Sequence, residues 1–389
     1  MFVPRGLPAV RCVAMTPQPH GTTPRRPWRR VVVKVGTSSI TDQDGRIDPQ
    51  RMQNLANAIL ELGRTTGHAP VLVSSGAGAA GRERLGLKLP LTLPRMQAAA
   101  AVGQELLMRH WEAAFAPTPV AQILLSAGDV HNRRTYVNAK NTFDASLKLG
   151  AMPIVNENDS VATDELKLGD NDSLSAWVAQ LVGADALILL TDVDGLYATP
   201  PTERSADAPL QEIHDLEAAM GLAGASHDPR GTGGMQTKLK AAAIARDAGI
   251  ETWIVRADPD VLKSLAGGEP RGTRIVAAGA PLSARKAWIV QQPPRGQLTL
   301  DDGALAALAA GKSLLPSGVV DVHGSFEFGD VVDLLGRDGI VHGRGLTNLS
   351  ADQARRMAGR HSRDMAEQLG RHDFDEVVHR DNLALHGGG

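Results

Sequence analysis

The chain has 389 residues, of which 42% are hydrophobic and 22% charged, and its formal net charge is −2. This composition is typical of a soluble globular chain with two or three domains. It argues against general polyanion binding, which usually needs a basic excess, and the 3% of aromatic residues offer few platforms for stacked bases. One cysteine, Cys12, excludes an internal disulfide framework. Since no apolar run approaches the ~20 residues that span a membrane, we expect a cytoplasmic protein.

The first segment, residues 1–30, is rich in proline and arginine and shows little periodicity. It also lacks the apolar core of a signal peptide. We expect it to be a disordered extension, or in part an artefact of the assigned start if Met15 is the true one.

From Val31 onward, apolar strands alternate with amphipathic helices. This alternation predicts an α/β fold, a three-layer αβα sandwich around a mainly parallel sheet, which we expect to span residues 31–278. The helix after the first strand has Asp48 as its N-cap and Pro49 in its first turn. The expected strands are 31–35, 71–73, 120–125, 153–155 and 186–190, and the expected helices begin near 49, 98, 138, 174 and 238.

Lys34 interrupts the first strand close to its C-terminal end. A lysine in a buried strand is costly unless it meets an anion, and open α/β sheets bind ligands beyond these strand ends. Lys34 is therefore a candidate phosphate-binding residue. The alternative is a lysine that extends to solvent from an edge strand.

A glycine-rich stretch, Gly231-Thr232-Gly233-Gly234-Met235-Gln236-Thr237-Lys238, precedes an apolar helical run. Its glycines let backbone N–H groups approach an anion closely, and the helix N-terminus adds a partial positive charge. The stretch predicts a phosphate cradle that ends in a lysine. The alternative is an ordinary surface loop that caps a helix.

A second glycine-rich loop follows the strand at 71–73. Gly76, Gly78 and Gly81 match the dinucleotide pattern G-x-G-x-x-G, but the acidic strand end that should follow is missing. We interpret this loop as a backbone-lined substrate or phosphate loop, with the Ser75 hydroxyl as a donor.

Two polar clusters follow the strand at 153–155, at residues 156–160 and 169–173. Such clusters can hold an ammonium group, orient hydroxyls or carry Mg²⁺. Alternatively, Ser173 only caps a helix, and Asp170 and Asp172 are ordinary charges of its first turn. Thr191 and Asp192 end the strand at 186–190, which suits a loop in contact with a nucleotide or a simple turn. No P-loop motif is present.

Taken in order, these motifs resemble the glutamate 5-kinases of the amino acid kinase family, over about residues 30–380. The resemblance implies transfer of a phosphoryl group from ATP to the γ-carboxylate of L-glutamate, the first step of proline biosynthesis. It places Lys34 and Lys238 beside the transferred group, with Asp172 organising both, and assigns glutamate to Ser75, Asp159 and Asn171. ATP would contact Lys34, Thr191, Asp192, Thr232, Gly233, Gly234, Met235, Gln236, Thr237 and Lys238.

The same resemblance implies several partners. Mg²⁺ would arrive with ATP, held mostly by phosphates and water, without a metal site on the protein. A dimer or tetramer, feedback inhibition by proline and hand-off of the product to a glutamate semialdehyde dehydrogenase are further expectations. Gly78 departs from the family pattern, which has a β-branched or larger apolar residue there, and this change would loosen the loop.

The C-terminal part resembles a PUA domain. We expect a linker at 279–296 with a short strand at Trp288–Val290, a PUA-like domain at 297–375 and a tail at 376–389. Ser350 and Gln353 predict a capping box. PUA domains elsewhere bind RNA, and four arginines give the following helix a basic face, but interleaved acids favour an ordinary solvated face. An RNA-binding protein with a sensory kinase domain, and a kinase for another acid, remain alternatives.

Overall fold

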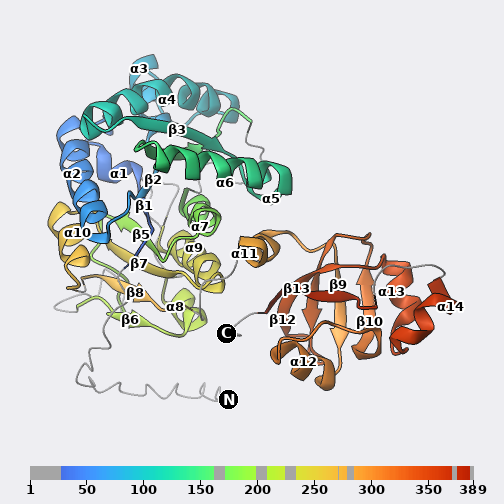
Figure 1. Cartoon of the computed structure of the whole chain (residues 1–389). Coiled ribbons are helices and arrows are strands. Elements are labelled where there is room, and N and C mark those ends of the chain that lie inside the picture. The colour runs from blue at the N-terminus through green and yellow to red at the C-terminus, as the bar shows by residue number, and fades with distance from the viewer. Residues whose placement is uncertain are drawn as a thin grey trace, which may run out of the picture.

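The computed structural model describes residues 28–161, 171–198, 208–223, 234–269, 271–277, 284–369 and 375–385. The chain forms two units, each built on its own sheet (Figure 1). The first sheet has eight strands in the order β3-β4-β2-β1-β5-β7-β8-β6, and the second has five in the order β10-β9-β11-β12-β13. Residues 1–27, which belong to the segment predicted to be disordered, and residues 386–389 of the predicted tail lie outside the described ranges.

The centre of the large sheet is β1 (Val31–Val35), every residue of which is buried. It pairs in parallel with β2 (Val71–Ser74) and β5 (Ala186–Thr191). The carboxyl ends of these strands therefore meet at one edge, where open α/β sheets bind ligands. The sheet is completed by β3 (Val120–Leu125), β4 (Met152–Glu157), β6 (Glu212–Ile213), β7 (Glu251–Arg256) and β8 (Thr273–Ile275).

Helices cover both faces of this sheet, which confirms the predicted three-layer sandwich. Val31, Val33 and Val35 face one apolar core, and Val32 faces the other, as the two-residue period of a strand requires. The first core is covered by α2 (Pro49–Thr66), α4 (Leu93–Phe115) and α10 (Pro259–Ala266). The second core is covered by α6 (Arg133–Lys148), α7 (Asn171–Val182), α8 (Leu216–Ala223) and α9 (Met235–Asp247).

Helix α3 (Ala77–Leu85) crosses α4 with backbone against backbone. A Cβ atom added at Gly81 would lie 1.7 Å from the carbonyl oxygen of Ala99, and one at Gly103 would lie 1.9 Å from that of Ala77. Gly81 thus permits the close approach of two helices. Gly78, in the same helix, has nothing within 4 Å of an added Cβ.

We expect Gly81→Ala to lower the free energy of unfolding by about 3 kcal/mol or more, because the two helices must move apart to admit the methyl group. Gly78→Ala is the matched control, and it should be neutral or stabilise the protein by up to about 1 kcal/mol. Urea denaturation of both variants measures the difference. Equal free energies of unfolding in the two variants would show that α3 and α4 can move apart at little cost.

The second unit is mostly β. It contains β9 (Gly296–Leu300), β10 (Val319–Gly324), β11 (Val331–Leu335), β12 (Val341–Thr347) and β13 (Val378–Leu385), with helices α12 (Asp302–Ala309), α13 (Ala351–Met357) and α14 (Met365–Leu369). The predicted capping box of α13 is confirmed, since Ser350 and Gln353 each accept from the other's backbone N–H.

Three boundary predictions are wrong. Trp288–Val290 lies in helix α11 (Ala284–Gln291), not in a strand, because a short apolar run fits either element. Residues 378–385, predicted as tail, form β13 and pair antiparallel with β12. Residues 28–30 belong to the fold, because the Trp28 side chain is buried and hydrogen-bonds Glu251 on β7.

Helix α11 joins the two units (Figure 1). It contacts α5 (Ala127–His131) and α7 of the first unit and β12 and β13 of the second. Trp288, Ile289 and Val290 are buried in a core that also contains Leu174 of α7 and Leu346 of β12. The Arg344 guanidinium donates to the Val290 carbonyl at 2.6 Å and pairs with Asp333 at 2.8 Å. Residues 288–290 of the predicted linker are therefore part of a packed apolar core.

In the parts of the chain that the structure describes, no helix combines the length and apolarity needed to cross a membrane.

Candidate active site

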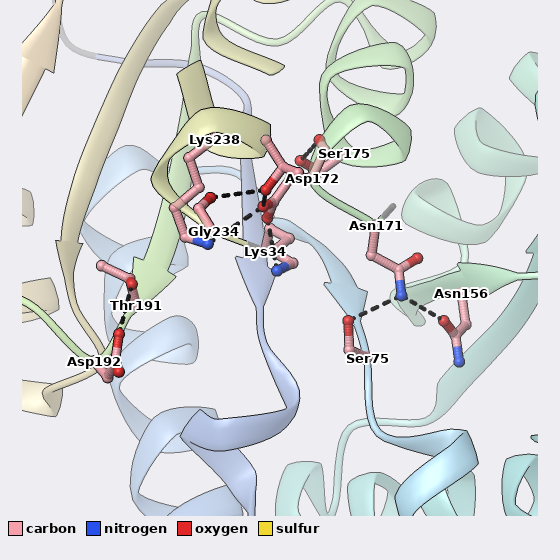
Figure 2. Close-up of polar contacts among 11 residues, drawn as sticks. Lys34, Ser75, Asn156, Asn171, Asp172, Ser175, Thr191, Asp192, Gly234 and Lys238 are labelled. Atoms are coloured by element: carbon pink, nitrogen blue, oxygen red, sulfur yellow. Dashed lines mark hydrogen bonds and ion pairs between the residues drawn. The ribbon is translucent and has the colours of Figure 1, made fainter. Parts of the chain in front are cut away.

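Two lysines and one aspartate meet at the carboxyl edge of the large sheet. Lys34 comes from β1, Asp172 from the first turn of α7, and Lys238 from the first turn of α9. The Lys34 Nζ lies 2.6 Å from Asp172 Oδ1, and the Lys238 Nζ lies 3.3 Å from Oδ2 (Figure 2). All three side chains are at most 6% exposed. The structure thus brings together three residues that are far apart in the sequence.

This ion-pair cluster shifts the pKa values of Asp172 and Lys238. Burial alone would raise the pKa of Asp172, but the adjacent Lys34 and Lys238 outweigh it and hold that pKa well below its usual range. Burial lowers the pKa of Lys238, opposed by the attraction of Asp172. With both lysines charged, two positive charges and one negative charge leave this cluster net positive, which favours an anion beside it.

The start of α9 adds backbone donors to this positive cluster. Its N-cap, Gly234, provides no side-chain cap, so N–H groups of the first turn remain available to an anion. The Thr237 hydroxyl contacts Asp172 Oδ2 at 2.7 Å and the Gly234 carbonyl at 2.8 Å, which ties this turn to the ion pair. Met235 and Gln236 lie in the same turn, whereas Thr232 and Gly233 lie outside the described residues.

An amide network lies on one side of the lysines (Figure 2). The Asn171 Nδ2 donates to Ser75 Oγ at 2.9 Å and to Asn156 Oδ1 at 3.0 Å. The Asn156 Nδ2 in turn donates to Gln104 Oε1 on α4, at 2.8 Å. Neither Asn156 nor Gln104 is among the site residues that the sequence predicts. Asn156 stands in a polar cluster that the sequence displays, but nothing marks Gln104 within its helix.

Asp159 follows β4 and lines a cavity of about 590 Å³ together with Gln104 and Asn158. Burial raises the pKa of Asp159 to about 6. A carboxylate in such a position gains most from a cationic group, because a cation offsets the lost hydration.

Thr191 and Asp192 lie on the other side of the lysines, at the end of β5 (Figure 2). The Thr191 hydroxyl donates to Asp192 Oδ1 at 3.1 Å. Asp192 is close enough to Lys238 to raise its pKa slightly against the larger effect of burial. The site thus has a polar amide side, a positive centre and a second polar side at adjacent strand ends.

Within the described ranges, no three His, Cys, Asp or Glu side chains gather closely enough to hold a metal ion. Asp172 itself is engaged by two lysines and a hydroxyl.

Known proteins match both units. A model described as the amino acid kinase family matches residues 29–256, and a PUA domain model matches residues 296–369. The chain is 46% identical over 363 residues to a glutamate 5-kinase of Synechococcus sp., covering 91% of this chain and 98% of that protein. A glutamate 5-kinase of Thermus thermophilus is also 46% identical over 363 residues, covering 92% and 97% of the two chains.

Among solved structures, the UMP kinase of Bacillus anthracis is similar with 18% identity and a TM-score of 0.46, over 64% of this chain and 97% of that one. The amino acid kinase model matches more than half of the chain, and the two curated relatives are matched over almost their full lengths. The chain belongs to the amino acid kinase family and, within it, to the glutamate 5-kinases that carry a C-terminal PUA domain.

Proposed function

We propose that this enzyme uses ATP to phosphorylate the γ-carboxylate of L-glutamate, giving L-glutamyl 5-phosphate as the first step of proline biosynthesis. The observation that carries the proposal is the buried Lys34–Asp172–Lys238 cluster, which lies between an amide network and a second polar loop. The relatives named glutamate 5-kinase support the choice of acceptor.

In this mechanism, a γ-carboxylate oxygen attacks the γ-phosphorus of ATP, and the bond from that phosphorus to the bridging oxygen of ADP breaks. The attacking oxygen is already ionised at neutral pH, so the step needs no general base. Asp172 is unsuited to be one, because its pKa is lowered by the two lysines. Its role is to hold Lys34 and Lys238 beside the charge that moves between the two substrates.

The amino acid would bind on the amide side. Asn171 Oδ1 is buried and has no hydrogen-bond partner within the described residues, so it can accept from an ammonium group. Asp159 supplies a carboxylate for the same group, and the Ser75 hydroxyl is a further polar contact. On the opposite side, Thr191 and Asp192, with the turn at Gly234–Thr237, would contact ATP.

Mg²⁺ fits this site as a companion of the nucleotide. The described residues form no cluster of three His, Cys, Asp or Glu side chains that could hold the ion. The phosphate oxygens of ATP would supply its ligands. When bound with ATP, the ion would neutralise part of the charge of the phosphates. Homo-oligomer formation, inhibition by proline and hand-off of the reactive acyl phosphate to a glutamate semialdehyde dehydrogenase belong to the same proposal.

The test is ATP consumption by the purified chain with Mg²⁺ and L-glutamate, with the acyl phosphate trapped by hydroxylamine. L-aspartate and N-acetyl-L-glutamate serve as control acceptors. We expect hydroxamate with L-glutamate alone. If another acid gives the product, the nucleotide half of the proposal stands, but the roles of Ser75, Asp159 and Asn171 must be reassigned.

RNA binding gains no specific support from α13. The Arg355 side chain pairs with Asp352 at 2.9 Å and donates to the Gly324 carbonyl at 2.6 Å. The Arg356 side chain donates to the Gln368 carbonyl at 3.4 Å. These two arginines therefore have partners within the fold, as an ordinary solvated helix face would.

Acid should weaken binding of the amino acid. The pKa of Asp159 is raised to about 6, so its charged form predominates only above that pH. We expect kcat/KM for L-glutamate to fall about ten-fold between pH 7 and pH 5, as the carboxylate that holds the ammonium is neutralised. In Asp159→Asn, kcat/KM should be low at both pH values and lose this decline. A decline of the same size in the variant would assign it to another group.

A further inference from the structure

Gln104 contacts the proposed amino acid site through one other residue, Asn156. It lies on α4, half-buried, and its Oε1 accepts the hydrogen bond from Asn156 Nδ2 at 2.8 Å. Asn156 is only 3% exposed, so loss of this acceptor would leave a buried amide donor unpaired. Helix α4 belongs to the opposite layer from α7, and this hydrogen bond therefore connects the site to the far side of the sheet.

The network fixes which atom of Asn171 faces the substrate. Asn156 Oδ1 accepts from Asn171 Nδ2 at 3.0 Å and from the Glu157 backbone N–H at 2.9 Å. The Asn171 Nδ2 uses its second hydrogen on Ser75 Oγ, at 2.9 Å. Both hydrogens of Asn171 are thus engaged, which leaves its buried Oδ1 as an acceptor without a partner in the described part of the chain.

We infer that Gln104 is a positioning residue for the amino acid substrate. By accepting from Asn156 Nδ2, it keeps the Asn156 carbonyl toward Asn171 and so keeps the Asn171 oxygen toward the bound ammonium group. This inference rests on the proposed function. It adds a positioning determinant for the substrate, because the arrangement presents a hydrogen-bond acceptor, and not a donor, to the free ammonium group.

An apolar residue at position 104 would leave Asn156 Nδ2 buried and unpaired. The Asn156 amide could then regain a hydrogen bond by rotating or by binding a water molecule. Either change disturbs its hydrogen bond to Asn171. The Glu157 backbone N–H still holds the Asn156 oxygen, so the effect should be moderate. Because Gln104 also lines the cavity, a direct contact with the substrate is the competing explanation.

The experiment is a double-mutant cycle of Gln104→Met and Asn156→Ala, with KM for L-glutamate, KM for ATP and kcat measured in the full chain. We expect Gln104→Met to raise KM for L-glutamate about ten-fold, with kcat and KM for ATP within about two-fold of wild type. In the Asn156→Ala background, the same substitution should change KM for L-glutamate by less than about two-fold, since its route to the site is already gone.

Gln368→Met is the matched control. Gln368 is half-buried like Gln104 but lies on α14 and does not line the cavity, so this variant should have the wild-type KM for L-glutamate. The inference is overturned by an unchanged KM in Gln104→Met, by effects that multiply in the double mutant, or by an equal rise in Gln368→Met. If the wild-type enzyme phosphorylates another acid instead of L-glutamate, the proposed function fails, and the same cycle with KM measured for that acid still decides the role of Gln104. If the enzyme phosphorylates no acid, the proposed function and this inference fail together.

Discussion

Replacing Lys238 by methionine should lower kcat by about 10²–10³-fold, the usual effect of removing one preorganised group that stabilises transition-state charge. The side chain is 6% exposed and lies 3.3 Å from Asp172, so water cannot take its place efficiently. The fold should survive, since Asp172 keeps its contact with Lys34 at 2.6 Å. Hydroxamate formation measures kcat, and thermal denaturation checks the fold.

Lys240→Met is the control for Lys238→Met. Lys240 lies two residues further along the same helix, α9, and its side chain is exposed. The two variants therefore share the substitution and the helix but differ in contact with the site. We expect Lys240→Met to keep kcat within about two-fold. Turnover that is unchanged in Lys238→Met would remove Lys238 from the mechanism.

Asp172→Asn should lower both activity and stability. The variant leaves two buried ammonium groups facing a neutral amide, and an uncompensated buried charge typically costs about 3–5 kcal/mol. We expect a loss of this size in the free energy of unfolding, measured by urea denaturation at pH 7. Asp260→Asn is the control, because the Asp260 side chain is 80% exposed and its ion pair with Lys263 contributes little.

The pH dependence of Asp172→Asn has a defined sign. The folded-state pKa of Asp172 is lowered, so its contribution to stability is present above the unfolded-state value of about 3.9 and is lost as the pH falls below it. The difference in unfolding free energy between wild type and variant should therefore shrink below about pH 4. A constant difference down to pH 3 would contradict the assigned ionisation state.

The sequence was sufficient to predict five of the eight strands of the large sheet and most of the polar groups at its edge. Lys34 stands out because a lysine is unusual in a buried strand, and the loop before Lys238 stands out by its glycines. Both signals are local, and the parallel sheet then brings their residues together. The same reasoning applies to Asp48 and Ser350, whose capping geometry depends only on the next three residues.

What could not be predicted depends on contacts between distant segments. Gln104 is an ordinary polar residue within its helix, and only the fold places it against Asn156. Strand β13 is ordered because it pairs with β12, and no short-range pattern encodes that pairing. Trp28 is likewise fixed by a glutamate 223 residues away. In each case the partner, and not the segment itself, determines the structure.

The burial of α11 affects how the two units can be separated. Its Trp288, Ile289 and Val290 complete a core shared by α7 and the C-terminal sheet, and α7 begins with Asn171 and Asp172. A chain cut after about residue 280 therefore exposes apolar side chains of the helix that carries the ion-pair aspartate. We therefore expect both halves of the molecule to unfold as one cooperative unit. If such a truncated chain lost its turnover, destabilisation of α7 would explain the loss as well as a function of the C-terminal domain in the reaction.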